Sequence, residues 1–149
     1  MRIVVAAATL ALGLFLGACA TGPDAPPQGT PYVEVYSGAQ LYGMSVTRIY
    51  EGDVIFFAQS DVVAGTASER YIQGRPGLWQ EVAALVAAEG PRVRPETVPE
   101  DYECMDYGMD SVEAVPPLGG FSKVWATCPD EGVQGLMQSV RDIIPPDPV

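Results

Sequence analysis

One alanine-rich stretch of the chain is bracketed by the pairs Pro76-Gly77 and Gly90-Pro91, which limit where a helix can begin and end. The residues between these pairs, 78–89, predict a helix, because their apolar members recur at helical spacing as Leu78, Val82, Leu85 and Val86. Three prolines in 91–99 predict an extended crossing segment after it. This helix therefore divides the chain into two regions, each with its own pattern.

The region before this helix has the two-residue alternation of β-strands. Segments 32–36 and 41–50 predict two strands, although Arg48 interrupts the apolar face of the second. In that second strand, one face carries Tyr42, Met44, Val46 and Tyr50, and the other Ser45 and Thr47. Glu51-Gly52 predicts a tight turn into 53–58, whose apolar residues on both faces indicate a strand covered on both sides. Small polar residues over 60–68 predict a loop, and 69–73 a fourth strand.

The region after the helix predicts a second antiparallel meander, from strands at 102–106, 111–115 and 121–127 with a turn at 107–110. Pro129, Asp130 and Glu131 suit the first turn of another helix. Its apolar stripe is Val133, Leu136, Met137, Val140 and Ile144, and Pro145-Pro146 ends it. We therefore expect residues 32–149 to form a single α+β domain, an antiparallel sheet of five to seven strands with two helices packed on one face.

The N-terminus has the features of an export signal: Arg2 supplies a positive charge, and the apolar run from Ile3 to Phe15 is shorter than the roughly 20 residues of a membrane span. The run ends at Leu16-Gly17-Ala18-Cys19, which resembles the lipobox of bacterial lipoproteins. An ordinary signal peptide cleaved by chance near a cysteine is the alternative.

The resemblance implies that residues 1–18 are a lipoprotein signal peptide and that Cys19 becomes the lipidated N-terminus. Its fatty acyl chains would hold the protein at a membrane without a transmembrane helix. Ala20 in the second mature position implies the outer membrane, on its periplasmic face, over the inner membrane. The proline-rich residues 19–31 would complete the attachment as an extended linker, reaching up to roughly 35 Å from the lipid.

An exported chain passes through an oxidising compartment, so we expect Cys104 and Cys128 to form a disulfide. Free core thiols or a metal-binding pair are the alternatives. The chain has no histidine to complete a soft metal site, and we expect no cofactor.

Charge limits the class of partner. Without Arg2, the 8 basic side chains become 7 against 19 acidic ones, a formal net charge of −12. Such a surface disfavours nucleic acid and anionic membrane faces. Solubility of a tethered domain explains this charge, and a cationic partner is the other explanation.

An acidic cluster is the densest polar feature, with six carboxylates in fourteen residues: Glu100, Asp101, Glu103, Asp106, Asp110 and Glu113. Ca²⁺ binds such oxygens, and Asp106 and Asp110 are the metal candidates, although their spacing does not match an EF-hand. We nevertheless interpret the cluster as a solvated acidic rim that blunts a sheet edge, and we expect no metal ion there. Paired carboxylates would also permit sugar hydrolysis if a cleft held them about 5 to 9 Å apart.

Other catalytic and binding sets are less complete. The absence of histidine removes the usual base of a nucleophile triad, and Ser122 and Lys123 would point to opposite faces of a strand. Four arginines around the first helix could converge on an anion: Arg70, Arg75, Arg92 and Arg94. Aromatic residues would either pack in the core or, where exposed, mark a recognition face: Tyr32, Tyr36, Tyr42, Tyr50, Trp79 and Trp125.

These observations favour a non-enzymatic envelope protein that is attached to the membrane through its N-terminal lipid and binds or scaffolds another envelope protein. The first alternative is an inhibitor of a cationic protein such as a lysozyme-like enzyme, which rests on the charge. The second alternative is a carboxylate-dependent hydrolase.

Overall fold

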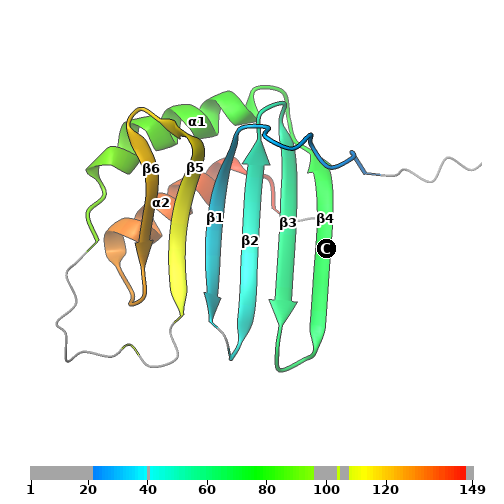
Figure 1. Cartoon of the computed structure of the whole chain (residues 1–149), viewed down its shortest axis with the longest axis vertical. Coiled ribbons are helices and arrows are strands. Elements are labelled where there is room, and N and C mark those ends of the chain that lie inside the picture. Colours follow the sequence, from blue (N-terminus) through cyan, green and yellow to red (C-terminus); the bar gives the residue numbers. More distant parts are fainter. Residues whose placement is uncertain (1–21, 40, 96–103, 105–107, 147–149) are drawn as a thin grey trace, which may run out of the picture.

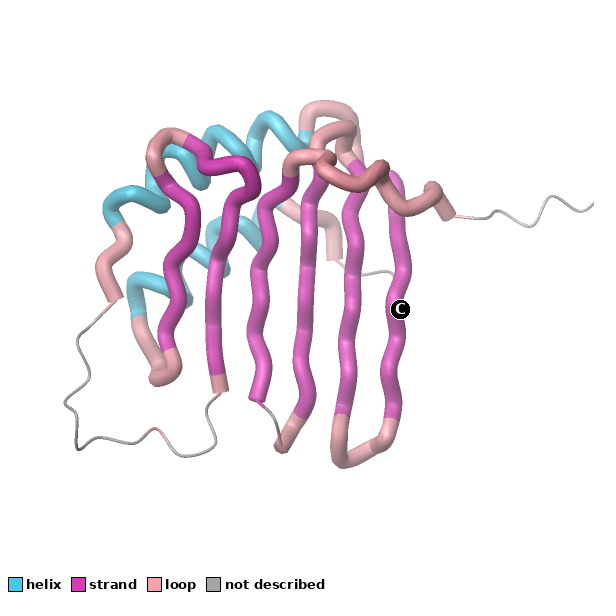
Figure 2. Tube along the Cα trace, in the orientation of Figure 1, coloured by secondary structure: helices cyan, strands magenta, loops and turns pink. Residues whose placement is uncertain are grey.

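The computed structural model describes residues 22–39, 41–95, 104 and 108–146. Within these residues the chain forms a six-stranded antiparallel sheet in the order β4-β3-β2-β1-β5-β6, together with two α-helices. Both helices lie on one face of the sheet, behind it in Figures 1 and 2. The predicted α+β architecture is therefore confirmed, with a strand number inside the predicted range.

The first four strands form a meander: β1 (Tyr32–Ala39), β2 (Gly43–Tyr50), β3 (Val54–Asp61) and β4 (Thr66–Gln73). The predicted loop over 60–68 is wrong, because only 62–65 connect β3 to β4. Strand β4 lies at the edge of the sheet and its first residues are exposed, so small polar residues fit there without an apolar neighbour. Leu41 and Tyr42 belong to the β1–β2 turn, where the sequence predicts a strand.

Strand β3 is covered less completely than predicted. Ile55 is fully buried, but Phe56 and Phe57 are only half-buried. The helices contact β2, β5 and β6, whereas Phe56 lies on the helix-free face beside Tyr71, with ring centroids 4.9 Å apart. On the helix-free face, Phe56 therefore packs against an aromatic neighbour within the sheet instead of under a second layer, whereas Phe57 packs against the core.

The second meander is a hairpin of β5 (Met109–Leu118) and β6 (Phe121–Ala126), joined to the first four strands because β5 pairs with β1. The predicted turn at 107–110 is wrong for Met109 and Asp110, which belong to β5 and pair with β1 and β6. Apart from Cys104, the predicted strand 102–106 lies outside the described residues.

Helix α1 (Leu78–Glu89) has its predicted bounds, and the 3-10 turn η1 (Gly90–Arg92) extends it. The extended segment predicted from Pro91 therefore begins only at Val93, and its residues 96–99 lie outside the described part of the chain.

Helix α2 (Glu131–Ile143) begins two residues later than the sequence indicates, because Asp130 is its N-cap and accepts a hydrogen bond from the Val133 amide at 2.8 Å. Pro129 therefore precedes the cap instead of lying in the first turn. The predicted apolar stripe of this helix is buried.

The core lies between the sheet and the two helices. The sheet contributes fully buried valines and isoleucines, α1 contributes a leucine, a tryptophan and two valines, and α2 contributes its stripe. The central members are Val33, Val35, Ile49, Ile55, Val112, Leu78, Trp79, Val82, Val86, Val133, Leu136, Met137 and Val140. This one-sided core leaves the opposite face of the sheet, here called the helix-free face, without a helix from the described part of the chain.

Residues 22–31, here called the N-terminal arm, have no regular secondary structure and pass across the ends of β2, β3 and β4 (Figure 1). At one end, the carbonyl of Pro31 accepts a hydrogen bond from the Glu51 amide at 2.8 Å. At the other, Gly22 lies against the Tyr71 carbonyl. Among the described residues, no helix is long and apolar enough to cross a membrane.

Candidate functional site

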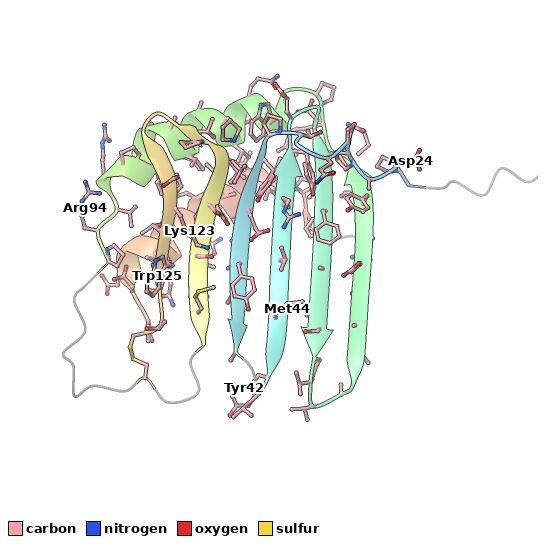
Figure 3. The ribbon with its side chains drawn as sticks, in the orientation of Figure 1. Asp24, Tyr42, Met44, Arg94, Lys123 and Trp125 are labelled. Carbon is pink, nitrogen blue, oxygen red and sulfur yellow. A yellow bond between two sulfur atoms is a disulfide. The ribbon has the colours of Figure 1, made fainter. Side chains whose placement is uncertain are left out.

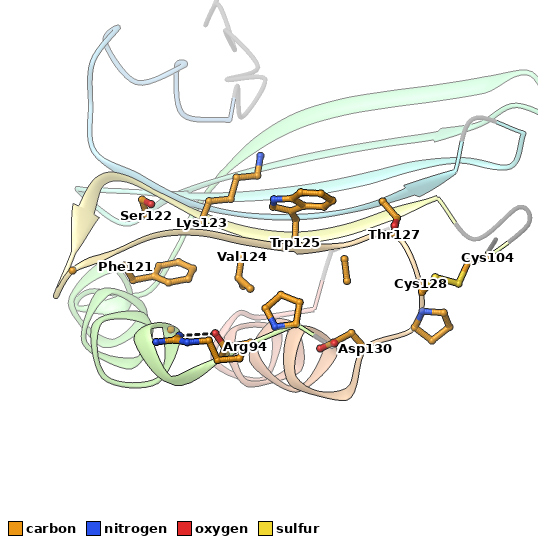
Figure 4. A pocket seen from close by; sticks show the side chains of 16 residues that line it. Arg94, Cys104, Phe121, Ser122, Lys123, Val124, Trp125, Thr127, Cys128 and Asp130 are labelled. Carbon is orange, nitrogen blue, oxygen red and sulfur yellow. Dashed lines mark hydrogen bonds between the residues drawn. A yellow bond between two sulfur atoms is a disulfide. The ribbon is translucent and has the colours of Figure 1, made fainter. Parts of the chain in front are cut away.

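A groove of about 1010 Å³ runs beside β6, the strand at the edge of the sheet (Figure 4). One wall is β6 together with the residues that lead into α2, and the other is the chain from Gly90 to Pro95. Because α1 and α2 pack on the same face of the sheet, their connecting segments meet at this edge. The groove is thus a product of the layer arrangement and not of a local motif.

The floor of the groove is apolar. Phe121 and Val124 point from β6 towards the helices, whereas Lys123 and Trp125 point to the opposite face (Figure 4). Phe121 and Val124 are three residues apart, and both residues between them, Ser122 and Lys123, are exposed. Burial along this part of β6 therefore does not follow the two-residue alternation of a regular strand. The pairing of β5 with β6 is also irregular here, with a shift of register between Glu113 and Leu118 that is typical of a β-bulge.

The outer edge of β6 has no strand neighbour among the described residues, because β6 pairs only with β5. Part of the backbone N–H and C=O groups of an edge strand point outward and can hydrogen-bond to another chain. Here that edge adjoins an apolar groove. A polypeptide bound along β6 could therefore form backbone hydrogen bonds to the strand and bury apolar side chains in the groove.

The charged groups that line the groove already have partners. Arg94 donates hydrogen bonds to the carbonyls of Pro91 and Val93, at 2.5 and 2.9 Å. The Lys123 ammonium lies 3.6 Å from the Glu113 carboxylate, and Asp130 caps α2. The groove therefore provides shape and apolar surface more than a free charge.

The predicted disulfide is confirmed. Cys104 and Cys128 are bonded, with Cα atoms 5.3 Å apart, and both line one end of the groove. The bond fastens residue 104 to the segment between β6 and α2. The sequence identified this pairing, but its place at a groove depends on the tertiary structure.

Among the described residues, no three side chains of the metal-binding types lie close enough together to hold a metal ion. Asp110 is buried, at 7 % exposure, while Asp106 and most of the acidic cluster lie outside the described residues. Glu113 instead pairs with Lys123 on the sheet.

The four candidate arginines do not converge. Arg70 lies on β4 and Arg75 just before α1, whereas Arg92 and Arg94 follow that helix. Its 12 residues separate the two pairs by about 18 Å. Arg75 also forms an ion pair with Glu81, so a single anion site built from all four is excluded.

The aromatic residues divide between core and surface. Tyr50 and Trp79 are buried, and Tyr32 and Tyr36 are half-buried. Tyr42 and Trp125 remain exposed, at 58 % and 54 %. Trp125 lies on β6 and lines the groove, and Figure 3 places it far from Tyr42 at the end of the β1–β2 hairpin. Only Trp125 is therefore positioned to contact a molecule at β6.

No local sequence pattern indicates the role of Arg48, whose guanidinium lies among aromatic side chains on the helix-free face. Its guanidinium lies 4.6 Å from the Tyr32 ring centroid and donates hydrogen bonds to Glu34 and to the Tyr50 hydroxyl. Burial alone would lower the pKa of Arg48, but the hydrogen bonds with Tyr50 and Glu34 outweigh burial and raise it. Its place amid aromatic residues becomes visible only once the strands are paired.

Two tyrosines on the same face are also affected by their surroundings. Burial raises the pKa of Tyr32 above its ordinary value, against the opposing effect of the Arg48 charge. Burial likewise raises the pKa of Tyr71, which lies beneath the N-terminal arm. Both shifts reflect the burial of the two hydroxyl groups on this face.

The chain matches no protein-family model, and neither a curated protein nor a solved structure is detectably similar to it.

Proposed function

We propose that this chain is a lipid-anchored, non-enzymatic protein of the bacterial cell envelope that binds another envelope protein along β6. The observation that carries the binding role is the apolar groove beside an edge strand that has no other strand neighbour among the described residues. The lipobox ending at Cys19 supports the anchor, and Ala20 favours the periplasmic face of the outer membrane.

The partner that fits this site is an extended polypeptide segment. A strand added at β6 would satisfy outward-facing backbone groups, as in other cases of strand addition to a sheet edge. Successive side chains of an extended strand point to opposite sides, so every second one would enter the groove over Phe121 and Val124. The others would lie on the helix-free face near Trp125.

The two alternative functions receive less support from the groove. A carboxylate-dependent hydrolase needs two carboxyl groups, whereas Asp130 is the single acidic side chain among the described residues that line the groove. An inhibitor of a cationic protein would present acidic groups, but Arg94 and Lys123 also line this site. Both observations favour recognition of an extended apolar segment.

Photo-crosslinking in intact cells tests this proposal. A photoreactive amino acid replaces Ser122 or Thr127, two exposed residues that line the groove, and Ser68 on β4 serves as the control. We expect both groove positions to crosslink to one short segment of a single envelope protein. Mass spectrometry should place the two crosslinks about as far apart in that segment as the two positions are here, because paired strands advance together.

A matched pair of variants controls for charge. Pro95→Asp places a carboxylate in the wall of the groove, and Val63→Asp places one in the exposed β3–β4 turn. The first should reduce crosslinking several-fold and the second should leave it unchanged. Equal crosslinking from Ser68 and Ser122, or adducts scattered over unrelated proteins, would refute strand addition at β6.

A further inference from the structure

The N-terminal arm leaves little free chain between the domain and the proposed lipid. Gly22 lies so close to the sheet that an added Cβ would come within 2.7 Å of the Tyr71 carbonyl oxygen. Pro23, Pro26 and Pro31 are half-buried in the arm, and the Pro31 carbonyl is hydrogen-bonded to the β2–β3 turn. The arm is thus in contact with the domain at both of its ends.

Covalent geometry then limits how far the domain can stand from the lipid. Cys19 and Gly22 are separated by three peptide units, which span at most about 11 Å. A free linker over 19–31 would instead reach roughly 35 Å. The sheet from β4 to β6 is about 24 Å wide, from five inter-strand spacings. A free linker is longer than the sheet is wide, so it would let either edge of the sheet face the membrane. The shorter connection from Gly22 does not reach that far and keeps the edge near Gly22 close to the membrane.

We propose that the N-terminal arm holds the domain edge-on at the membrane, with β4 next to the bilayer and the β6 groove facing away from it. This inference rests on the lipidation of Cys19 proposed above. The arm ends at Tyr71 on β4, and Figure 3 places Asp24 beyond β4, on the side away from β6. Strands β4 and β6 are the two opposite edges of the sheet.

Charge on this edge does not attract phospholipid. Asp24, Asp61 and Glu69 are exposed there, and carboxylates are repelled by an anionic membrane face. The short connection, and not the surface of β4, therefore sets the orientation. Its consequence is that the groove is presented to the aqueous space, where an extended segment of another protein has access.

Fluorescence quenching by lipid-attached nitroxide tests the orientation. The full lipidated chain is placed in vesicles of phosphatidylethanolamine and phosphatidylglycerol, with a fluorophore attached through p-azidophenylalanine at Ser68 on β4 or at Ser122 on β6. We expect quenching to be several-fold stronger at Ser68 than at Ser122. Equal quenching at the two positions would overturn the inference.

Variants of the arm separate orientation from anchoring. Gly22→Val should displace the arm from Tyr71, and a flexible Gly-Ser insertion before Gly22 should lengthen the connection, so each should abolish the difference between Ser68 and Ser122. Gly135→Ala adds a methyl group where no neighbouring atom lies within 4 Å and should keep it. A chain that stays out of the membrane fraction, with neither label quenched, would instead contradict the proposed lipid anchor.

Discussion

The side chain of Asp53, in the β2–β3 turn, caps the start of helix α1 by accepting a hydrogen bond from the backbone amide of Trp79. Its Oδ1 accepts a hydrogen bond from the Trp79 amide at 2.8 Å, and its Oδ2 accepts one from the Gly77 amide at 2.9 Å. The residue at the N-cap position, Gly77, has no side chain to do this. Asp53 therefore joins the β2–β3 turn to the start of α1.

Replacement of Asp53 by alanine should lower the free energy of unfolding by about 1 to 2 kcal/mol, because two amides at the helix start lose their acceptor. Asp53→Asn keeps one acceptor oxygen and should show a smaller loss. Urea denaturation followed by circular dichroism measures both. If Asp53→Ala unfolds at the wild-type urea concentration, the carboxylate does not stabilise α1.

Loss of the Arg48 guanidinium should also destabilise the protein. Arg48→Met leaves the Glu34 carboxylate, whose side chain is only 15 % exposed, without its ion-pair partner. We expect a loss of about 1 to 2 kcal/mol, reduced because Arg48 itself is partly solvated. In the Arg48→Met background, Glu34→Gln should recover part of the loss, and a double-mutant cycle measures this coupling. Strictly additive effects would rule out the pairing.

Removal of the disulfide should lower the free energy of unfolding by roughly 3 to 4 kcal/mol. The bond between Cys104 and Cys128, which are 24 residues apart, limits the conformations of the unfolded chain, and the reduced chain regains them. The soluble Cys19→Ala variant is the matched background, because its remaining cysteines are the bonded pair. Urea unfolding of this variant with and without dithiothreitol measures the effect. A midpoint that reductant does not change would mean that the bond adds no stability.

Stability should fall at alkaline pH. The pKa values of Tyr32 and Tyr71 are raised in the folded protein, so the unfolded chain ionises first, near pH 10. The free energy of unfolding is then independent of these groups below about pH 10 and decreases as pH rises through the folded-state values. Tyr32→Phe and Tyr71→Phe should each flatten this decrease, measured by denaturation at several pH values. An unchanged alkaline slope in both variants would contradict the assignment.

The sequence predicts the parts of the fold that have strong local signals. The bounds of α1 follow from flanking proline and glycine, and the stripe of α2 from its helical period. The start of β4 carries no strand signal, because Thr66 and its neighbours are small and exposed, as an edge strand permits. The sequence predicts Pro129 inside α2, whereas Asp130 caps the helix, because a capping role depends on backbone geometry that local sequence does not specify.

The candidate site was much less accessible to sequence reasoning. The number of cysteines and the expected compartment predict the bond between Cys104 and Cys128, which the structure confirms. The groove, however, requires the segment after α1, which includes Val93, to lie opposite Val124 of β6, and no local pattern specifies that arrangement. The roles of Arg48 and Asp53 depend likewise on strand register and on a turn that reaches a distant helix.

Mass spectrometry of the mature N-terminus tests the central claim most directly. In protein purified from bacterial envelopes, the account predicts that the chain begins at Cys19 followed by Ala20, and that the cysteine carries a thioether-linked diacylglycerol. An unmodified thiol at Cys19, or an N-terminus at another residue, would contradict both the lipid anchor and the orientation derived from it.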